Sequence, residues 1–149
     1  MIRYVKGNIL ESDAEALVNP VNCVGVMGKG LALQFKKSYP SNFNQYVQAC
    51  KAGKLKPGIV YPVFEQEKWI LNFPTKRHWR QKSKLEYIEQ GLQDLIRIIE
   101  TKDIQSVAVS ALGCGLGGLN WDEVKKLIEQ YLGSLDIDIY VYEPSFMAP

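Results

Sequence analysis

The stretch SVAVSALGCGLGGLNWDEVKKLIEQYL, residues 106–132, decides the fold class. It opens with a near-continuous apolar run, SVAVSAL (106–112), which is typical of a strand buried on both faces. The glycine-rich ALGCGLGG (111–118) follows. The amphipathic WDEVKKLIEQYL (121–132) then predicts a helix with Asn120 as its N-cap. A strand, a glycine loop and a helix in succession indicate an α/β protein.

The rest of the chain repeats this alternation. A helical pattern over 31–53 is split at Pro40 and stops near Gly53, and a second begins at Ser83, which we interpret as a capping box with Glu86. Strands are predicted at 2–6, 15–21, 58–64, 68–74 and 136–143, the third and fourth of them forming a hairpin across EQE. This order predicts a three-layer α/β/α sandwich with a central mixed sheet.

Composition places the chain among ordinary globular proteins. Its 149 residues fit one domain, 1–149, and 46% are hydrophobic and 23% charged. No apolar run approaches the roughly 20 residues of a membrane-spanning helix, and the N-terminus lacks a signal-peptide core. The number of cysteines is odd, and no two of them have CxxC spacing: they are Cys23, Cys50 and Cys114. This argues against a disulfide framework or a zinc site. We expect a cytoplasmic monomer without cofactor or metal.

The stretch NFPTKRHWRQKSK (72–84) concentrates cations in a chain of net charge +2. It is predicted to be a loop between a strand end and a helix start. Like charges and partial desolvation would lower the pKa of Lys76 and leave a nucleophilic amine, although from the spacing alone a solvated cationic loop is the favoured explanation. Trp79, flanked by cations, suits stacking of a nucleic-acid base; the alternative is an aromatic lid on its own helix.

Two glycine loops each follow a predicted strand and open a helix: NPVNCVGVMGKG (19–30) and ALGCGLGG (111–118). Such loops bind anions through free N–H groups, and two of them suit a diphosphate, although glycines also serve tight turns. The first loop departs from the Walker A spacing. The second satisfies GxGxxG, with Glu143 where a ribose-binding acid belongs, so a nicotinamide dehydrogenase competes; the chain is too short for its remaining parallel units.

The blocks VKGNIL (5–10), ALVNPVNCVGVMGKGLALQFKKSYP (16–40), NFPTKRHWR (72–80) and ALGCGLGGLNW (111–121) together resemble a macrodomain, the ADP-ribose-binding α/β/α fold. Within that fold the chain is similar to the branch related to terminal ADP-ribose glycohydrolases. More closely it resembles the macrodomain of the DarG antitoxins, which reverse ADP-ribosylation of thymine in single-stranded DNA by the DarT toxin. The resemblance implies a DNA ADP-ribosyl glycohydrolase whose partners are ADP-ribose, ADP-ribosylated single-stranded DNA and a cognate toxin, with no membrane.

The resemblance also implies residue roles. Asn8 and the backbone of Ile9 receive the adenine, and Asn22 orients the distal ribose beside Gly28, Lys29 and Gly30. Lys76 is the catalytic lysine. The diphosphate is wrapped by Gly113, Cys114, Gly115, Leu116, Gly117 and Gly118, and the DNA flanking the modified base is held by Arg77, His78, Trp79, Arg80 and Lys82.

Three points stay open on the sequence alone. A reader module that binds ADP-ribose without catalysis would use the same loops, as would an eraser of ADP-ribose on protein glutamate or on small derivatives. Related glycohydrolases carry an aspartate at the position of Gly117, for which Asp122 is a speculative replacement. DarG antitoxins continue into a second domain that contacts the toxin, so the chain is either one domain of such a protein or stands alone.

Overall fold

The sheet has six strands in the order β1-β6-β5-β2-β4-β3. All neighbours pair in parallel except β3, which is antiparallel to β4. The computed structural model describes residues 1–144. Its elements are β1 (Ile2–Val5), the 3-10 helix η1 (Ile9–Glu11), β2 (Ala16–Val21), α1 (Gly30–Ser38), α2 (Pro40–Lys51), β3 (Tyr61–Glu65), β4 (Lys68–Pro74), α3 (Leu85–Thr101), β5 (Ser106–Val109), α4 (Trp121–Leu132) and β6 (Asp138–Tyr142).

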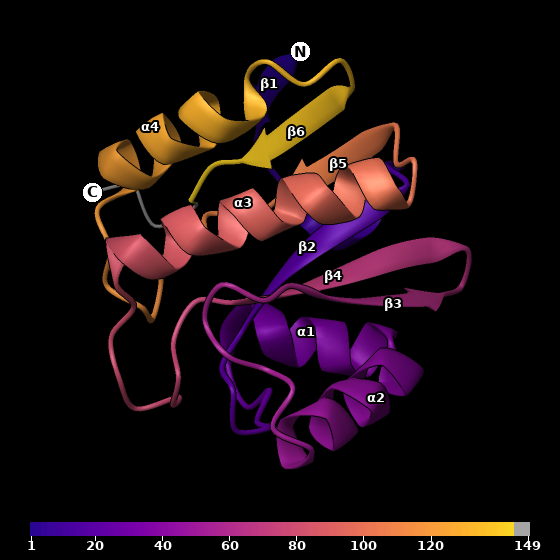
Figure 1. Cartoon of the computed structure of the whole chain (residues 1–149), viewed down its shortest axis with the longest axis vertical. Helices are drawn as coiled ribbons and strands as arrows, with labels where there is room; N and C mark the ends of the chain where they lie inside the picture. The colour runs from indigo at the N-terminus through magenta and orange to yellow at the C-terminus, as the bar shows by residue number, and fades with distance from the viewer. Residues whose placement is uncertain (145–149) are drawn as a thin grey trace.

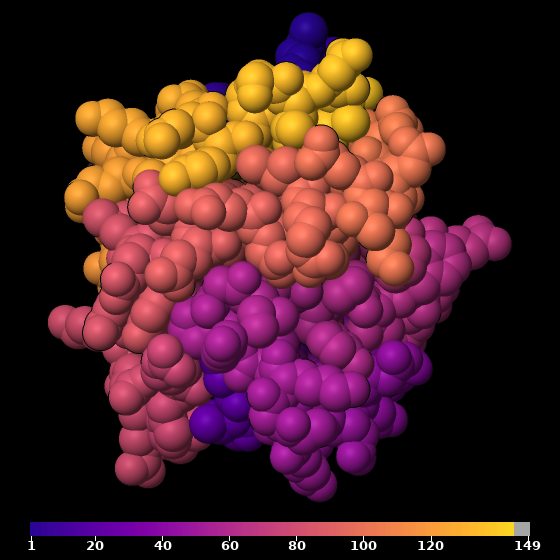
Figure 2. Space-filling model, in the orientation of Figure 1, coloured from indigo at the N-terminus to yellow at the C-terminus, as the bar shows by residue number. Residues whose placement is uncertain are grey.

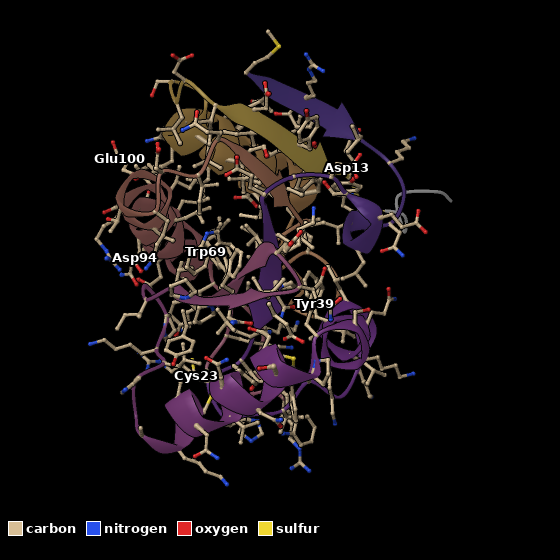
Figure 3. All side chains as sticks on the ribbon, turned by 90° about the vertical axis from the view of Figure 1, so that its right-hand side faces the viewer. Asp13, Cys23, Tyr39, Trp69, Asp94 and Glu100 are labelled. Atoms are coloured by element: carbon tan, nitrogen blue, oxygen red, sulfur yellow. The ribbon has the colours of Figure 1, made fainter. Side chains whose placement is uncertain are left out.

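The strands are apolar on both faces because helices cover both faces. Alternate residues point to opposite sides: on β2, Val18 packs with α3 and α4, whereas Leu17 packs with α1. Figure 1 shows α3 and α4 together on one side and α1 with α2 on the other. Figure 3 labels one residue from each side of the sheet. Trp69 packs against the apolar core between the sheet and α3 and α4, and Tyr39 belongs to the apolar core beneath α1. The predicted three-layer sandwich with a mixed sheet is confirmed.

Most predicted helices and strands are present, with ends that differ by a few residues from the predicted ones. The hairpin turns on Gln66 and Glu67, both with positive φ (53° and 62°), as a type I′ turn requires. The helical region 31–53 divides at Pro40, the first residue of α2. Asn120 caps α4 by accepting a hydrogen bond from the Glu123 N–H (3.2 Å). Within residues 1–144, no helix has both the length and the apolar character needed to cross a bilayer.

Two predictions about local structure are wrong. The apolar run 106–112 pairs as a strand only to Val109, because the chain then turns and the Leu112 N–H bonds the Ser110 carbonyl (2.9 Å). Ser83 does not cap α3, which begins at Leu85 without a side-chain cap. Instead the Ser83 N–H donates to the Gly117 carbonyl (3.0 Å), and its buried hydroxyl has no hydrogen-bond partner. A contact between loops has displaced a local capping motif.

A buried asparagine network ties α2 to the sheet. The Asn72 amide on β4 donates to Asn42 Oδ1 on α2 (2.8 Å), and Asn72 Oδ1 accepts from both Asn42 (3.1 Å) and Asn19 of β2 (3.1 Å). All three side chains are fully buried. Because a buried amide without a partner is costly, these residues require one another. The network fixes β2, β4 and α2 at the level where the two strands end.

Gly91, in the middle of α3, provides a sharp test of this packing. A Cβ at Gly91 would overlap the ring of Phe73, so Gly91→Ala should destabilise the protein by about 1–3 kcal/mol through overpacking. At an exposed helix position the same change would stabilise by about 1 kcal/mol. Urea denaturation of both proteins shows whether Gly91→Ala lowers or raises the free energy of unfolding. The Phe73→Leu/Gly91→Ala double variant should recover part of the loss, and a midpoint raised by Gly91→Ala alone would contradict this account.

Candidate functional site

The carboxyl ends of the five parallel strands share one edge of the sheet. From β2 the chain passes to β3 and β4 on one side and then crosses, through α3, to β5 on the other. In open α/β sheets, ligands bind outside the carboxyl ends of strands at such a reversal. Three loops gather there: 22–29 after β2 (the first glycine loop), 75–84 after β4 (the cationic loop) and 110–120 after β5 (the second glycine loop).

Asn22 shapes the first glycine loop. Its Oδ1 accepts from the Val24 N–H (3.0 Å) and from the Tyr46 hydroxyl (2.7 Å), and its amide donates to the Val26 carbonyl (2.7 Å). The side chain proposed to orient the ribose is therefore also the scaffold of its loop. Tyr46, a buried residue of α2, was missed in the sequence, because nothing in its local pattern distinguishes it from an ordinary core aromatic.

The end of the first glycine loop opens α1. Gly28, Lys29 and Gly30 are exposed, and Gly30 has a φ of +59°. Lys29 occupies the N-cap position but provides no side-chain cap. An anion at this point would complement the positive end of the helix dipole.

Only some residues of the second glycine loop are exposed to solvent. Gly115, Leu116 and Gly118 are exposed, and Leu116, 67% exposed, lies 3.8 Å from the point that a Cβ on Gly30 would occupy. The two glycine loops are thus neighbours. Cys114, in contrast, is buried in the core, where burial raises the pKa of its thiol to about 12. The Cys114 side chain is directed away from any ligand, so its predicted role is limited to its backbone.

Gly117 and Ser83 join the second glycine loop to the cationic loop. A Cβ at Gly117 would overlap Ser83 Oγ and lie 2.5 Å from the Gly113 carbonyl oxygen. The position therefore cannot hold the aspartate found in related glycohydrolases unless the backbone moves. Asp122 is exposed in the first turn of α4. The only sequence signal at Ser83 was the misleading capping motif.

Backbone hydrogen bonds on both sides of Lys76 hold it next to the end of β2 and the first glycine loop. The Thr75 N–H bonds the Val21 carbonyl (2.9 Å), and the Arg77 carbonyl accepts from the Cys23 N–H (3.0 Å). The lysine side chain is partly buried, and its Nζ donates to the Trp79 carbonyl (3.1 Å). Burial lowers the pKa of Lys76, in the predicted direction, whereas neighbouring cations do not contribute to this shift.

The other cations of the loop have separate positions. The Arg80 guanidinium lies 4.6 Å from the centre of the Trp79 ring, which is 44% exposed. His78 Nδ1 accepts the Arg80 N–H (3.1 Å), and the His78 ring lies 5.1 Å from that of Trp79. Arg77 lies over Tyr87 of α3 (5.8 Å). Lys82 Cδ lies 3.8 Å from the point that a Cβ on Gly118 would occupy, so Lys82 stands beside the second glycine loop.

Asn8 and Ile9 lie after β1, at the far end of the same edge. Asn8 Oδ1 accepts the Leu10 N–H (3.0 Å) and caps η1, a short helix that the sequence did not predict. The Ile9 side chain is buried with Leu17, which leaves its backbone as the possible ligand contact. Within residues 1–144, no three His, Cys, Asp or Glu side chains are placed to hold a metal ion.

Comparison with known proteins identifies close relatives. Residues 18–128 match the family model described as Macro domain. A DNA ADP-ribosyl glycohydrolase of Thermus aquaticus is 49% identical over 150 residues, which cover 97% of this chain and 41% of the relative. The structure titled macrodomain of Mycobacterium tuberculosis DarG is 51% identical, with a TM-score of 0.93 over 97% of this chain and 99% of that one.

A second solved structure is a complex with ADP-ribose. Thermosipho africanus DarTG in complex with ADP-ribose superposes with a TM-score of 0.93 at 37% identity, over 99% of this chain and 43% of that chain. The chain spans less than half the length of the curated relatives named DNA ADP-ribosyl glycohydrolase.

Two glycines of the second loop form a matched test of its geometry. Gly117→Ala should weaken ADP-ribose binding at least about tenfold, equivalent to 1.4 kcal/mol, because the methyl group must displace Ser83 or the Gly113 carbonyl. Gly115→Ala should change it little, since a Cβ there has no neighbour within 4 Å. Calorimetric titration with ADP-ribose measures both. Equal effects of the two variants would argue against a tightly packed loop at the ligand.

Proposed function

This chain belongs to the macro domain family, and we propose that it is a DNA ADP-ribosyl glycohydrolase. It would remove ADP-ribose from thymine in single-stranded DNA and so act as antitoxin to a DNA ADP-ribosyltransferase. One observation carries the proposal: Lys76, with a pKa lowered by burial, stands at the carboxyl edge beside the first glycine loop. The names of the relatives support ADP-ribosylated DNA as the substrate, although they belong to proteins more than twice as long.

The strand order suits the shape of ADP-ribose. Asn8 and Ile9 follow β1, the second glycine loop follows β5, the first follows β2, and Lys76 follows β4. In the sheet these strands occur in the order β1, β5, β2, β4, with β6 between the first two. Neighbouring strands lie about 4.8 Å apart, so the edge from β1 to β4 is roughly 19 Å long. Adenine, diphosphate, distal ribose and anomeric carbon would follow one another along it.

The chemistry requires a group that tolerates positive charge at the anomeric carbon. The bond from this carbon to the thymine nitrogen breaks through an oxocarbenium-like transition state, and an ammonium ion next to it would be repelled. A neutral amine is not repelled and can form a bond to the carbon as thymine leaves with the bonding electrons. Water would then replace the amine and release ADP-ribose. The lowered pKa of Lys76 favours this route, in which Nζ must first leave the Trp79 carbonyl.

The cationic loop supplies contacts for the DNA. Trp79 is exposed enough to stack on a base, and Arg80 beside it can meet a phosphate. His78 supports this pair through its hydrogen bond to the Arg80 backbone. Lys82 is closer to the second glycine loop, so we assign it to the diphosphate as well as to DNA.

A time course with a single-stranded oligonucleotide ADP-ribosylated on thymine tests the activity. Lys76→Ala and Lys76→Arg should both slow release of ADP-ribose at least about a hundredfold, because arginine keeps the charge but cannot act as a neutral amine. Binding of free ADP-ribose should change only a few-fold. Mass spectrometry follows the loss of ADP-ribose. Tight binding without release by the parent protein would indicate a reader, or an eraser of another linkage such as a glutamate ester.

The pH dependence separates the two possible roles of Lys76. If the neutral amine reacts, the single-turnover rate should rise with pH, about tenfold per unit below the pKa of Lys76, and level off before the ordinary lysine value. Any residual rate of Lys76→Arg should not follow this rise. A parent rate that falls as pH rises would mean that the ammonium form assists the departure of thymine, and would exclude nucleophilic attack.

A further inference from the structure

The modest net charge conceals a strong separation of charge along the chain. Between Glu15 and Glu65 there is no aspartate or glutamate but there are six lysines, and residues 68–84 add six cations without an acid. Residues 85–143 carry eleven acids and four cations. Such asymmetry between halves of a chain is typical of proteins that bind an extended anion.

The fold turns this separation into two oppositely charged sides. The acid-free segment includes α1 and α2, which cover one side of the sheet, whereas the acidic segment forms α3 and α4 on the other. Near the site, the acidic side has a shallow groove lined by Glu86, Glu89 and Glu123 with Lys126. A phosphodiester strand that leaves the site would be repelled there and attracted toward α2.

The end of α2 packs on the first glycine loop, which in turn is bonded to the cationic loop. The Tyr46 hydroxyl donates to the Asn22 carbonyl (2.9 Å), and a Cβ on Gly25 would lie 3.8 Å from the Cβ of Cys50, so the last turns of α2 pack on the first glycine loop. Cys23 of that loop, labelled beside α2 in Figure 3, bonds the Arg77 backbone. In Figure 2 a small indigo patch, from the N-terminal part of the chain, is visible between the surfaces of α2 and of the cationic loop.

Three lysines at the end of α2 and just after it are exposed and make no ion pair with a carboxylate among the described residues. Lys51 ends α2, and Lys54 and Lys56 flank the buried Leu55, which anchors the following loop in the core. Within residues 1–144 the one ion pair closer than 4.0 Å joins Arg97 to Asp94 (2.7 Å). The charges of the three lysines are thus not neutralised by a protein carboxylate.

We propose that the single-stranded DNA flanking the modified thymine leaves the site across the end of α2, with its phosphates on Lys51, Lys54 and Lys56. This inference rests on the proposed function and adds a direction to it. Trp79 and Arg80 hold the strand at the site, and the three lysines extend that contact along one flank. The acidic groove between α3 and α4 keeps the strand from the opposite side.

Paired variants test this path. Lys51→Gln/Lys54→Gln is compared with Lys125→Gln/Lys126→Gln, which removes the same charge from α4. The affinity for a short and for a long modified oligonucleotide, and the rate at which each releases ADP-ribose, are measured at several salt concentrations. Each phosphate contact to single-stranded DNA contributes about 0.7 to the slope of log affinity against log salt. The first variant should therefore lower the slope for the long substrate by about 1.4, or about sevenfold between 50 and 200 mM salt.

The short substrate and free ADP-ribose serve as internal controls. Both should behave as in the parent protein, and the α4 variant should keep the parent slope on the long substrate. If Lys51→Gln/Lys54→Gln retains that slope, or if both variants lose it equally, the path is wrong while the proposed function stands. If these lysines prove to bind phosphatidylserine vesicles with no effect on oligonucleotides, the surface serves a lipid and the path is likewise wrong. Failure of the parent on every DNA substrate would instead refute the proposed function.

Discussion

The backbone pairing of β2 with β4 continues past the ends of both strands, and the site depends on this continuation. The Thr75 N–H bonds the Val21 carbonyl, and the Cys23 N–H bonds the Arg77 carbonyl. Lys76 lies between these two hydrogen bonds, so its backbone is held, and its side chain donates to the Trp79 carbonyl. The asparagine network below, centred on Asn72, holds the same two strands to α2. Positioning of this kind is what a reaction at one carbon atom requires.

Close packing limits the chemistry as well as supporting it. Ser83 fills the space beside Gly117, so no side chain can enter the second glycine loop from that position. If the proposed glycohydrolase activity holds, the reaction has no carboxylate at this position and depends more heavily on Lys76. The buried Ser83 hydroxyl has no partner, which is a cost that the contact between the two loops offsets.

Net charge is a poor guide to the partners of this protein. A value of +2 suggests weak electrostatics, yet α1 and α2 on one side of the sheet contain no aspartate or glutamate, whereas α3 and α4 on the other side are rich in them. Fields of opposite sign on two sides can orient an anionic strand even when the whole molecule is nearly neutral. Surface electrostatics is screened over about 8 Å at physiological salt, so the position of each cation matters more than the total.

The sequence by itself determined the alternation of strands and helices, the hairpin, the division at Pro40 and the Asn120 cap. These depend on residues within a turn or a strand of one another, and local patterns record such neighbours well. Only the tertiary structure decided that Ser83 serves the second glycine loop, that Cys114 faces the core, that Tyr46 holds Asn22, and that burial rather than neighbouring cations shifts Lys76. Each of these follows from which loops meet at the carboxyl edge. Strand order sets those meetings, and it arises from pairing between segments far apart in the chain, which no local pattern records.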